Sequence, residues 1–183
     1  MHEILVKRDI LHTDETTLQV LKEPGRSAET KSYMWLYRTG RDGPPIVLYD
    51  YQTTRASKHP ISFLAGFKGY LQTDGYSGYG QLDGVTLVGC FAHARRKFTE
   101  ALKALPADQK DKPVAAKLGL DYCNRLFAID RELKDLSDEK RYEKRLELAK
   151  PLLDEFYAWL KKQRQQTLPK SLFGQAITYC LNQ

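Results

Sequence analysis

Two aspartates occur in matching sequence contexts. Asp14 lies in the segment LHTDET and Asp74 in the segment LQTDGY, and a threonine comes directly before each acid. Both acids follow an alternation of apolar and polar residues that is typical of a half-buried strand. Two carboxylates that lie close together repel each other, and a divalent cation relieves that repulsion. If their strands are neighbours in one sheet, the pair predicts a metal site for phosphoryl transfer.

The segment YLQTDGYSGYG (70–80) places three glycines after Asp74. Glycine permits a sharp turn and lets a phosphate approach the backbone closely. A simpler interpretation is also open, because Asp-Gly is a common turn signal and Asp14 then becomes an ordinary strand residue. Tyr76 and Tyr79 suggest a tyrosine nucleophile, but a covalent recombinase needs a cluster of Arg and His around it. We expect both rings to pack beside the site or to stack near DNA.

The first hundred residues predict a β-rich region with an ordered series of elements. We expect three strands joined as an antiparallel meander, then a helix, two further strands and a second helix, in the ranges 10–21, 31–40, 46–52, 59–67, 70–74, 85–91 and 93–105. This order is that of a ribonuclease-H-like fold. The predicted fold class is therefore α/β, with a mixed sheet, flanking helices and a helical insertion after the fifth strand.

The remaining residues predict amphipathic helices at 113–136 and 138–166, because apolar residues recur there every three or four positions. Ser137 separates them as in a helical hairpin, and Pro151 is expected to kink the second helix. A last helix is expected in SLFGQAITYCLNQ (171–183). The hairpin either covers a core or forms a dimer interface. Its nearly balanced charge argues against its being the main DNA surface.

Composition narrows the class of protein. The net charge is +6 and the isoelectric point is near 9.1, which favours an anionic partner, most often nucleic acid. Three widely spaced cysteines support neither a zinc ribbon nor a disulfide framework, and are expected to be free thiols in a reducing cytoplasm. We expect no signal peptide and no membrane span, because every long apolar run is interrupted by charges.

The segment CFAHARRKF (90–98) concentrates positive charge near the start of the helix expected at 93–105. Helix N-terminal amides and basic side chains together suit a DNA phosphate. A packed or capping histidine is an equally good interpretation of the histidine in this segment. The candidate DNA-binding residues here and in the loop before the helix at 59–67 are His93, Arg95, Arg96, Lys97, Arg55 and Lys58.

Several separated motifs together resemble one protein family. HTDETTLQVL, PPIVLYDYQTTRASKHPISFLAGFKGYLQTDGYSGY, VGCFAHARRKF and FGQAITYCLNQ occur in order and with similar spacing in the insertion sequence 66 family of DDE transposases. The resemblance is densest over residues 10–100. It implies a ribonuclease-H-like fold that cuts and joins the DNA ends of a mobile element, using Mg²⁺ or Mn²⁺. Asp14 and Asp74 match the first and second family acids, as catalytic residues and metal ligands.

The third family acid is a glutamate in an Asn-Asn-x-x-Glu-Arg type of segment, which does not occur in this sequence. The available Glu100, Glu147 and Glu155 lack that context. We therefore expect a catalytic-domain fragment that is inactive alone. It would comprise catalytic-core residues 1–105, a helical insertion at 106–168 and a returning core helix at 169–183.

The expected partners are transposon-end and target DNA, with possible self-association and no small-molecule substrate, in a bacterial cytoplasm. The alternative is a non-catalytic DNA-binding or self-association module that regulates an intact transposase.

Overall fold

The structure is a computed structural model that describes residues 1–107 and 114–183. It divides into two compact units, Met1–Cys90 and Phe91–Gln183, and each is described by itself. The predicted start of a helix at residue 113 lies outside the described residues.

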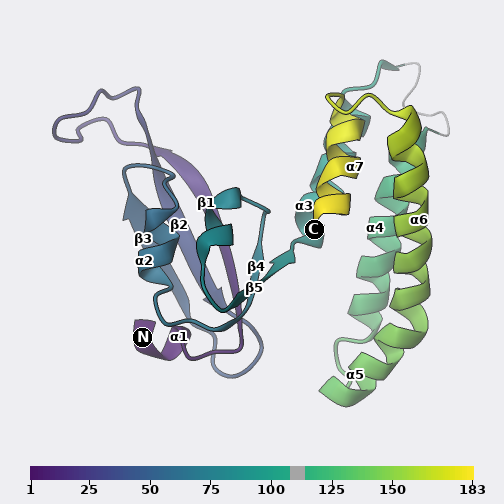
Figure 1. The fold of residues 1–183 in the computed structure, drawn as a ribbon, viewed down its shortest axis with the longest axis horizontal. Helices are drawn as coiled ribbons and strands as arrows, with labels where there is room; N and C mark the ends of the chain where they lie inside the picture. The colour runs from purple at the N-terminus through teal and green to yellow at the C-terminus, as the bar shows by residue number, and fades with distance from the viewer. Residues whose placement is uncertain (108–113) are drawn as a thin grey trace. The chain divides into compact units, whose positions relative to one another are not determined.

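The first unit is built on one mixed sheet, in which five strands of the described residues have the order β3-β2-β1-β4-β5 (Figure 1). Strands β1, β2 and β3 pair antiparallel, whereas β4 is parallel to both β1 and β5. This confirms the predicted meander and the predicted mixed α/β architecture. The strands are β1 Ile10–Gln19, β2 Lys31–Thr39, β3 Val47–Gln52, β4 Gly69–Thr73 and β5 Val85–Gly89.

One face of this sheet carries the core of the first unit. Leu11 and Leu71 lie opposite each other in register on β1 and β4, and both are fully buried. Trp35 and Tyr37 of β2 extend the same apolar face. Alternation along the strands places these residues on one side of the sheet, as the sequence pattern predicts.

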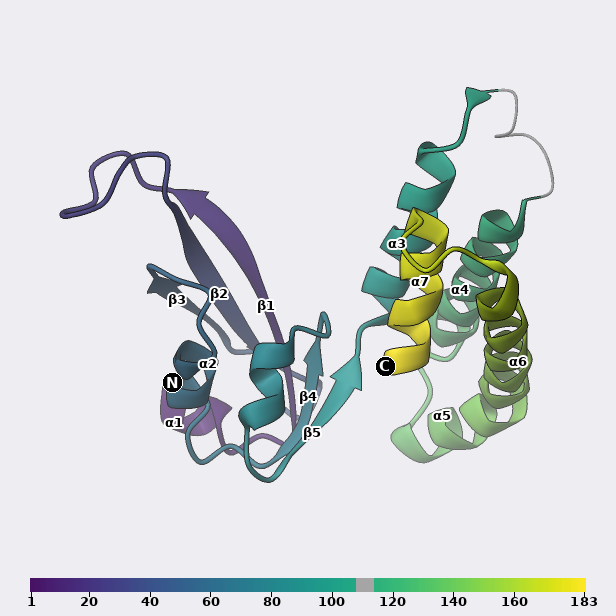
Figure 2. The same cartoon turned by 45° about the horizontal axis from the view of Figure 1, so that its top comes forward.

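Short helices cover that face (Figure 2): α1 His2–Leu5, α2 Lys58–Phe63 and the 3₁₀ helix η1 Ser77–Gln81. They contribute the buried residues Leu5 and Tyr79 to the core. The predicted helix at 59–67 is shorter than expected. Helix α2 ends at Phe63, and a turn with Gly66 at φ +84° then carries Leu64 and Phe67 into the core.

The second unit is helical. Its helices are α3 Phe91–Lys103, α4 Ala115–Glu132, α5 Asp138–Lys144, the π-helical turn η3 Arg145–Ala149, α6 Lys150–Gln166 and α7 Leu172–Asn182. Phe98 of α3 is fully buried among the rings of Phe156, Trp159 and Phe173, with centroid distances of 6.1, 6.4 and 6.2 Å. An aromatic cluster from α3, α6 and α7 therefore forms much of this core.

Helix α3 belongs to the second unit, and its residues Ala94 and Phe98 pack in the core of that unit. The sequence predicted this helix at the end of a domain spanning residues 1–105. The expected domain boundaries after residues 105 and 168 stay predictions. Among the described residues, no helix is both long and apolar enough to cross a membrane.

The helical hairpin is confirmed in outline. Ser137 is the N-cap of α5 and accepts a hydrogen bond from the backbone N–H of Lys140. A π-helical turn, Arg145–Ala149, precedes Pro151, which lies in the first turn of α6. The kink expected at Pro151 stays a prediction. Part of the predicted apolar stripe is exposed, namely Leu118, Tyr142, Leu146 and Leu153.

The aromatic cluster generates a stability prediction. Phe98→Ala should lower the free energy of unfolding of the second unit by about 3–5 kcal/mol, because it leaves a cavity among buried rings. Urea unfolding followed by the fluorescence of Trp159, in a Trp35→Phe background, measures this change. The control is Leu146→Ala, which removes a side chain that is 47% exposed and should cost less than about 1 kcal/mol. Similar losses in both variants would contradict the proposed core.

Candidate functional site

The parallel pairing of β1 with β4 aligns the two aspartates. Ile10 pairs with Tyr70, Leu11 with Leu71 and His12 with Gln72, so each partner is 60 residues further along the chain. The same offset relates Asp14 to Asp74. Asp14 lies within β1, and Asp74 is the first residue after β4. The register therefore aligns Asp14 in β1 with Asp74, which lies directly after the end of β4.

The threonines before the two acids are buried. Thr13 is 4% and Thr73 is 2% exposed. The Thr13 hydroxyl lies 3.2 Å from the Tyr79 hydroxyl, and the backbone N–H of Gly75 donates to the Thr73 hydroxyl at 3.1 Å. Since side chains alternate along a strand, Asp14 projects from the face opposite to Thr13. The matching sequence contexts thus correspond to matching structural positions.

Asp74 also begins a tight turn. Its Oδ1 accepts a hydrogen bond from the backbone N–H of Tyr76 at 2.8 Å, and Gly75 has a φ of +87°. A Cβ on Gly78 would lie 2.2 Å from the Tyr76 ring. The turn therefore requires glycine at both positions. This confirms that Asp74 starts a turn, while the role of Asp14 and the closeness of a phosphate stay predictions.

Another acid of β1, Glu15, faces the side of the strand opposite to Asp14. It is not the glutamate of the family motif. Its side chain is only 2% exposed, and Oε2 accepts a hydrogen bond from the Tyr79 hydroxyl at 2.8 Å. Arg55 Nε donates to Glu15 Oε1 at 2.6 Å. Burial raises the pKa of Glu15, while the hydrogen bonds from Tyr79 and Arg55 act in the opposite direction.

Arg55 joins Glu15 to Asp74. Its guanidinium also lies 3.4 Å from Asp74 Oδ2 and 4.1 Å from the centre of the Tyr76 ring. Burial disfavours the charge of Arg55, but the hydrogen bond and charge of Glu15 and the charge of Asp74 raise its pKa above the ordinary value. The sequence predicted Arg55 as a DNA contact, and the structure makes it the counter-ion of two acids.

Sequence reasoning missed Glu15. Its signal was available, because a residue next to a solvent-facing strand acid must face the core side, where a carboxylate needs a cationic partner. The partner could not be found by spacing, since Arg55 lies 40 residues further along the chain. Tyr79, whose hydroxyl donates to Glu15, is fully buried, and burial raises the pKa of its phenol. It packs in the core of the first unit, and the expectation that both tyrosine rings pack beside the site or stack near DNA stays a prediction.

The remaining candidate DNA contacts occupy several positions. Lys58 is exposed at the start of α2 in the first unit. On α3, in the second unit, Arg95 Nε donates to Asn124 Oδ1 at 2.7 Å, and Lys97 lies 5.3 Å from the Tyr179 ring centre. Arg96 is exposed on the same helix and His93 is half-buried. Arg95 thus has a structural partner.

The glutamates considered as substitutes for a third acid lie in the second unit. Glu147 forms an ion pair with Lys144 at 2.6 Å, and Glu155 accepts a hydrogen bond from the Tyr122 hydroxyl at 2.6 Å. Glu100 is exposed on α3. Within residues 1–107 and 114–183, no group of three His, Cys, Asp or Glu side chains is arranged to hold a metal ion.

Comparison with known proteins adds to this geometry. A family model described as "Transposase IS66 family" matches residues 1–183. The chain belongs to this family. Its membership connects the chain with transposition and with insertion sequences. No solved structure matches the chain.

The curated relatives in this comparison come from Sinorhizobium fredii (strain NBRC 101917 / NGR234). Uncharacterized protein y4hP is 33% identical, over 93% of this chain and 34% of its own length. Uncharacterized protein y4qI is 30% identical, over 92% of this chain and 33% of its own length. The chain thus spans about a third of the length of the relatives that it matches.

The ion pair between Arg55 and Glu15 generates a second prediction. Arg55→Met should lower the free energy of unfolding of the first unit by about 2 kcal/mol, because Glu15 then loses its charged hydrogen-bond donor. Adding Glu15→Gln should restore part of this loss, since no buried charge is left unpaired. Urea unfolding followed by Trp35 fluorescence, in a Trp159→Phe background, measures both variants.

The control is Lys58→Met, which changes an exposed cation nearby and should alter stability by no more than about 0.5 kcal/mol. Equal losses in Arg55→Met and in the double variant would contradict the coupling between Arg55 and Glu15.

Proposed function

We propose that this chain supplies the catalytic region of a DDE transposase, in which Asp14 and Asp74 bind Mg²⁺ or Mn²⁺ and the substrate is DNA. The observation that carries the proposal is the 60-residue offset between β1 and β4, which aligns the two acids that match the family motifs. Family membership supports a role in transposition. The strand-cleavage and strand-transfer activity proposed is that of the complete transposase.

The assignment to a ribonuclease-H-like fold is part of this proposal. Its support is the strand order β3-β2-β1-β4-β5, with an antiparallel meander followed by two parallel strands. A strand order alone does not determine function, so the proposed function depends on where the acids lie. The central strand β1 carries Asp14, and its parallel neighbour β4 ends directly before Asp74.

The two carboxylates fit the usual ligation of Mg²⁺, which takes one or two protein carboxylates and completes its shell with water and phosphate oxygens. A bound cation would polarise the phosphoryl group and stabilise the oxygens that attack and leave. Asp14 is fixed by the pairing of β1 with β2. Asp74 uses Oδ1 to hold its turn, and its Oδ2 accepts a hydrogen bond from Arg55 at 3.4 Å, so a bound cation would share Oδ2 with the guanidinium.

Arg55 and Glu15 would act as positioning residues. The guanidinium of Arg55 balances the charge of Asp74 and is itself held by the buried Glu15. In the proposed transposase a third carboxylate, which the family resemblance places outside this sequence, would complete the site. We therefore propose that the chain alone has little or no activity. Binding of transposon-end and target DNA, self-association and a cytoplasmic location in a bacterium belong to the same proposal.

Metal binding tests the role of the aspartates directly. We expect the 183-residue chain to bind Mn²⁺ weakly, and Asp14→Asn or Asp74→Asn to weaken that binding by more than about tenfold, because each removes a carboxylate ligand. Electron paramagnetic resonance of free Mn²⁺ in a titration gives the dissociation constants. Asp83→Asn serves as the control, since Asp83 is an exposed acid of the same unit.

The proposal fails if Mn²⁺ binding is unchanged in both aspartate variants while circular dichroism shows intact folding. DNA binding that needs no metal and is unaffected by Asp14→Asn, combined with the absence of Mn²⁺ binding, would favour the non-catalytic regulator instead.

A further inference from the structure

Charge is unevenly distributed along the helical hairpin. Residues 138–155 contain five basic and six acidic side chains, whereas residues 156–183 contain four basic side chains and no acid. The nearly balanced charge of the hairpin as a whole therefore conceals a positive region at its C-terminal end. This region comprises the second half of α6, the turn that follows and α7.

Four of the five basic residues in 138–155 are engaged in ion pairs. Arg141 contacts Asp138 at 3.0 Å, Lys144 contacts Glu147 at 2.6 Å and Lys150 contacts Asp154 at 2.7 Å. Arg145 also pairs with Asp130. By contrast, Lys161, Lys162, Arg164 and Lys170 form no ion pair within the part of the chain that the structure describes.

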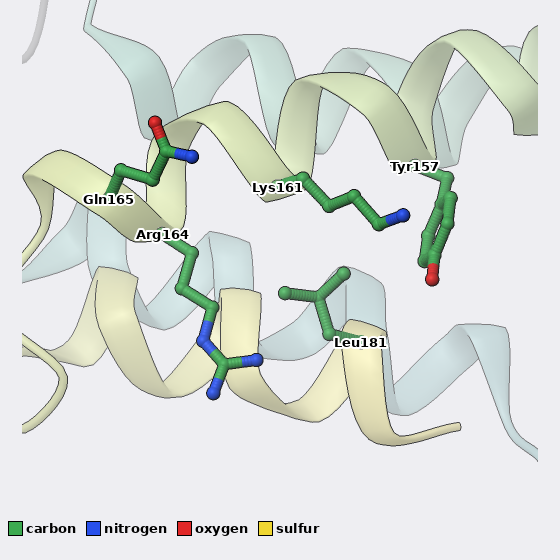
Figure 3. A pocket seen from close by; sticks show the side chains of 5 residues that line it. All are labelled: Tyr157, Lys161, Arg164, Gln165 and Leu181. Atoms are coloured by element: carbon green, nitrogen blue, oxygen red, sulfur yellow. The ribbon is translucent and has the colours of Figure 1, made fainter.

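Two of these cations, Lys161 and Arg164, line a groove of about 510 Å³ between α6 and α7, shown in Figure 3. Lys161 extends toward the ring of Tyr157, with its ammonium 4.2 Å from the ring centre. The groove is lined by Tyr157, Lys161, Arg164, Gln165 and Leu181. The four residues from α6 follow a spacing of four, three and one, which places them on one face of the helix.

The helix dipole accounts for only part of this arrangement. A cation in the last turn of a helix is stabilised by the carbonyl groups there, and Arg164 occupies the last turn of α6. Lys161 lies before that turn, and Lys170 lies beyond the helix. Helix stability alone therefore does not explain why the positive residues are clustered without acids.

We propose that this groove binds the phosphate backbone of DNA. Its polar lining consists of an ammonium, a guanidinium, a phenol and an amide, which are side-chain types that donate hydrogen bonds to phosphate oxygens. No acid lines it, so a polyanion meets no repulsion. The groove belongs to the second unit, whereas both aspartates belong to the first. The inference rests on the proposed function only in choosing DNA as the polyanion.

The salt dependence of DNA binding tests this proposal. The variant Lys161→Gln/Arg164→Gln removes two phosphate contacts, so the slope of log affinity against log salt should decrease by about 2. At 0.1 M salt the affinity should fall by roughly 10- to 100-fold. Fluorescence anisotropy of a labelled DNA duplex, titrated with the 183-residue chain in the absence of divalent metal, gives both quantities.

The matched control is Lys117→Gln/Lys140→Gln, which removes the same charge from exposed positions on α4 and α5. The control should show less than about half of the slope change that the groove variant shows relative to wild type. Circular dichroism should show both variants folded. An unchanged slope in the groove variant, or an equal loss in the control, would overturn the proposal.

Poly-glutamate serves as a competitor of the labelled DNA in the same assay. If it bound as tightly as DNA, and with the same dependence on Lys161 and Arg164, the groove would be a site for an acidic protein and the assignment to DNA would be wrong. Because metal is absent from this assay, its result is independent of Mn²⁺ binding by Asp14 and Asp74. Failure of the groove proposal can thus be distinguished from failure of the proposed catalytic site.

Discussion

The register between β1 and β4 is the constraint on which the first unit depends. Leu11 and Leu71 lie opposite each other and are both fully buried, so the pairing that closes the core also fixes the 60-residue offset. A slip of one residue would move Leu11 to the other face of the sheet and would turn Asp14 toward the core. Hydrophobic burial therefore holds the alignment of Asp14 with Asp74.

A buried carboxylate imposes the second constraint. Glu15 cannot lie on the core side of β1 without a compensating cation, and Arg55 supplies it from the segment between β3 and α2. Because the same guanidinium reaches Asp74, the charge that stabilises Glu15 also sets the electrostatic environment of the turn after β4. The Arg55 guanidinium also lies over the ring of Tyr76, whose hydroxyl donates to the Arg55 carbonyl. Structural and candidate catalytic acids thus share one cation.

The sequence predicted what local patterns determine. Alternation located the strands, and the N-cap Ser137 located the start of a helix. Longer-range features escaped it. The contact between Arg55 and Glu15 spans 40 residues, and nothing local to either residue indicates the other. The sequence predicted too long a helix at α2 because apolar spacing continues through Leu64 and Phe67. These two residues reach the core from a turn instead. Apolar periodicity reports which residues are buried, and a turn can bury them as well as a helix.

Net charge is an equally incomplete guide to a binding surface. In α5 and η3, basic residues lie three or four positions from acids and neutralise them locally, as helical spacing allows. The second half of α6 has the same helical geometry but no acids, so its cations remain available to a partner in solution. A count over the whole hairpin averages these two regions and yields near-neutrality. What decides the potential of a surface is whether each charge has a counter-ion within a few ångströms, because close pairs cancel and solitary cations add.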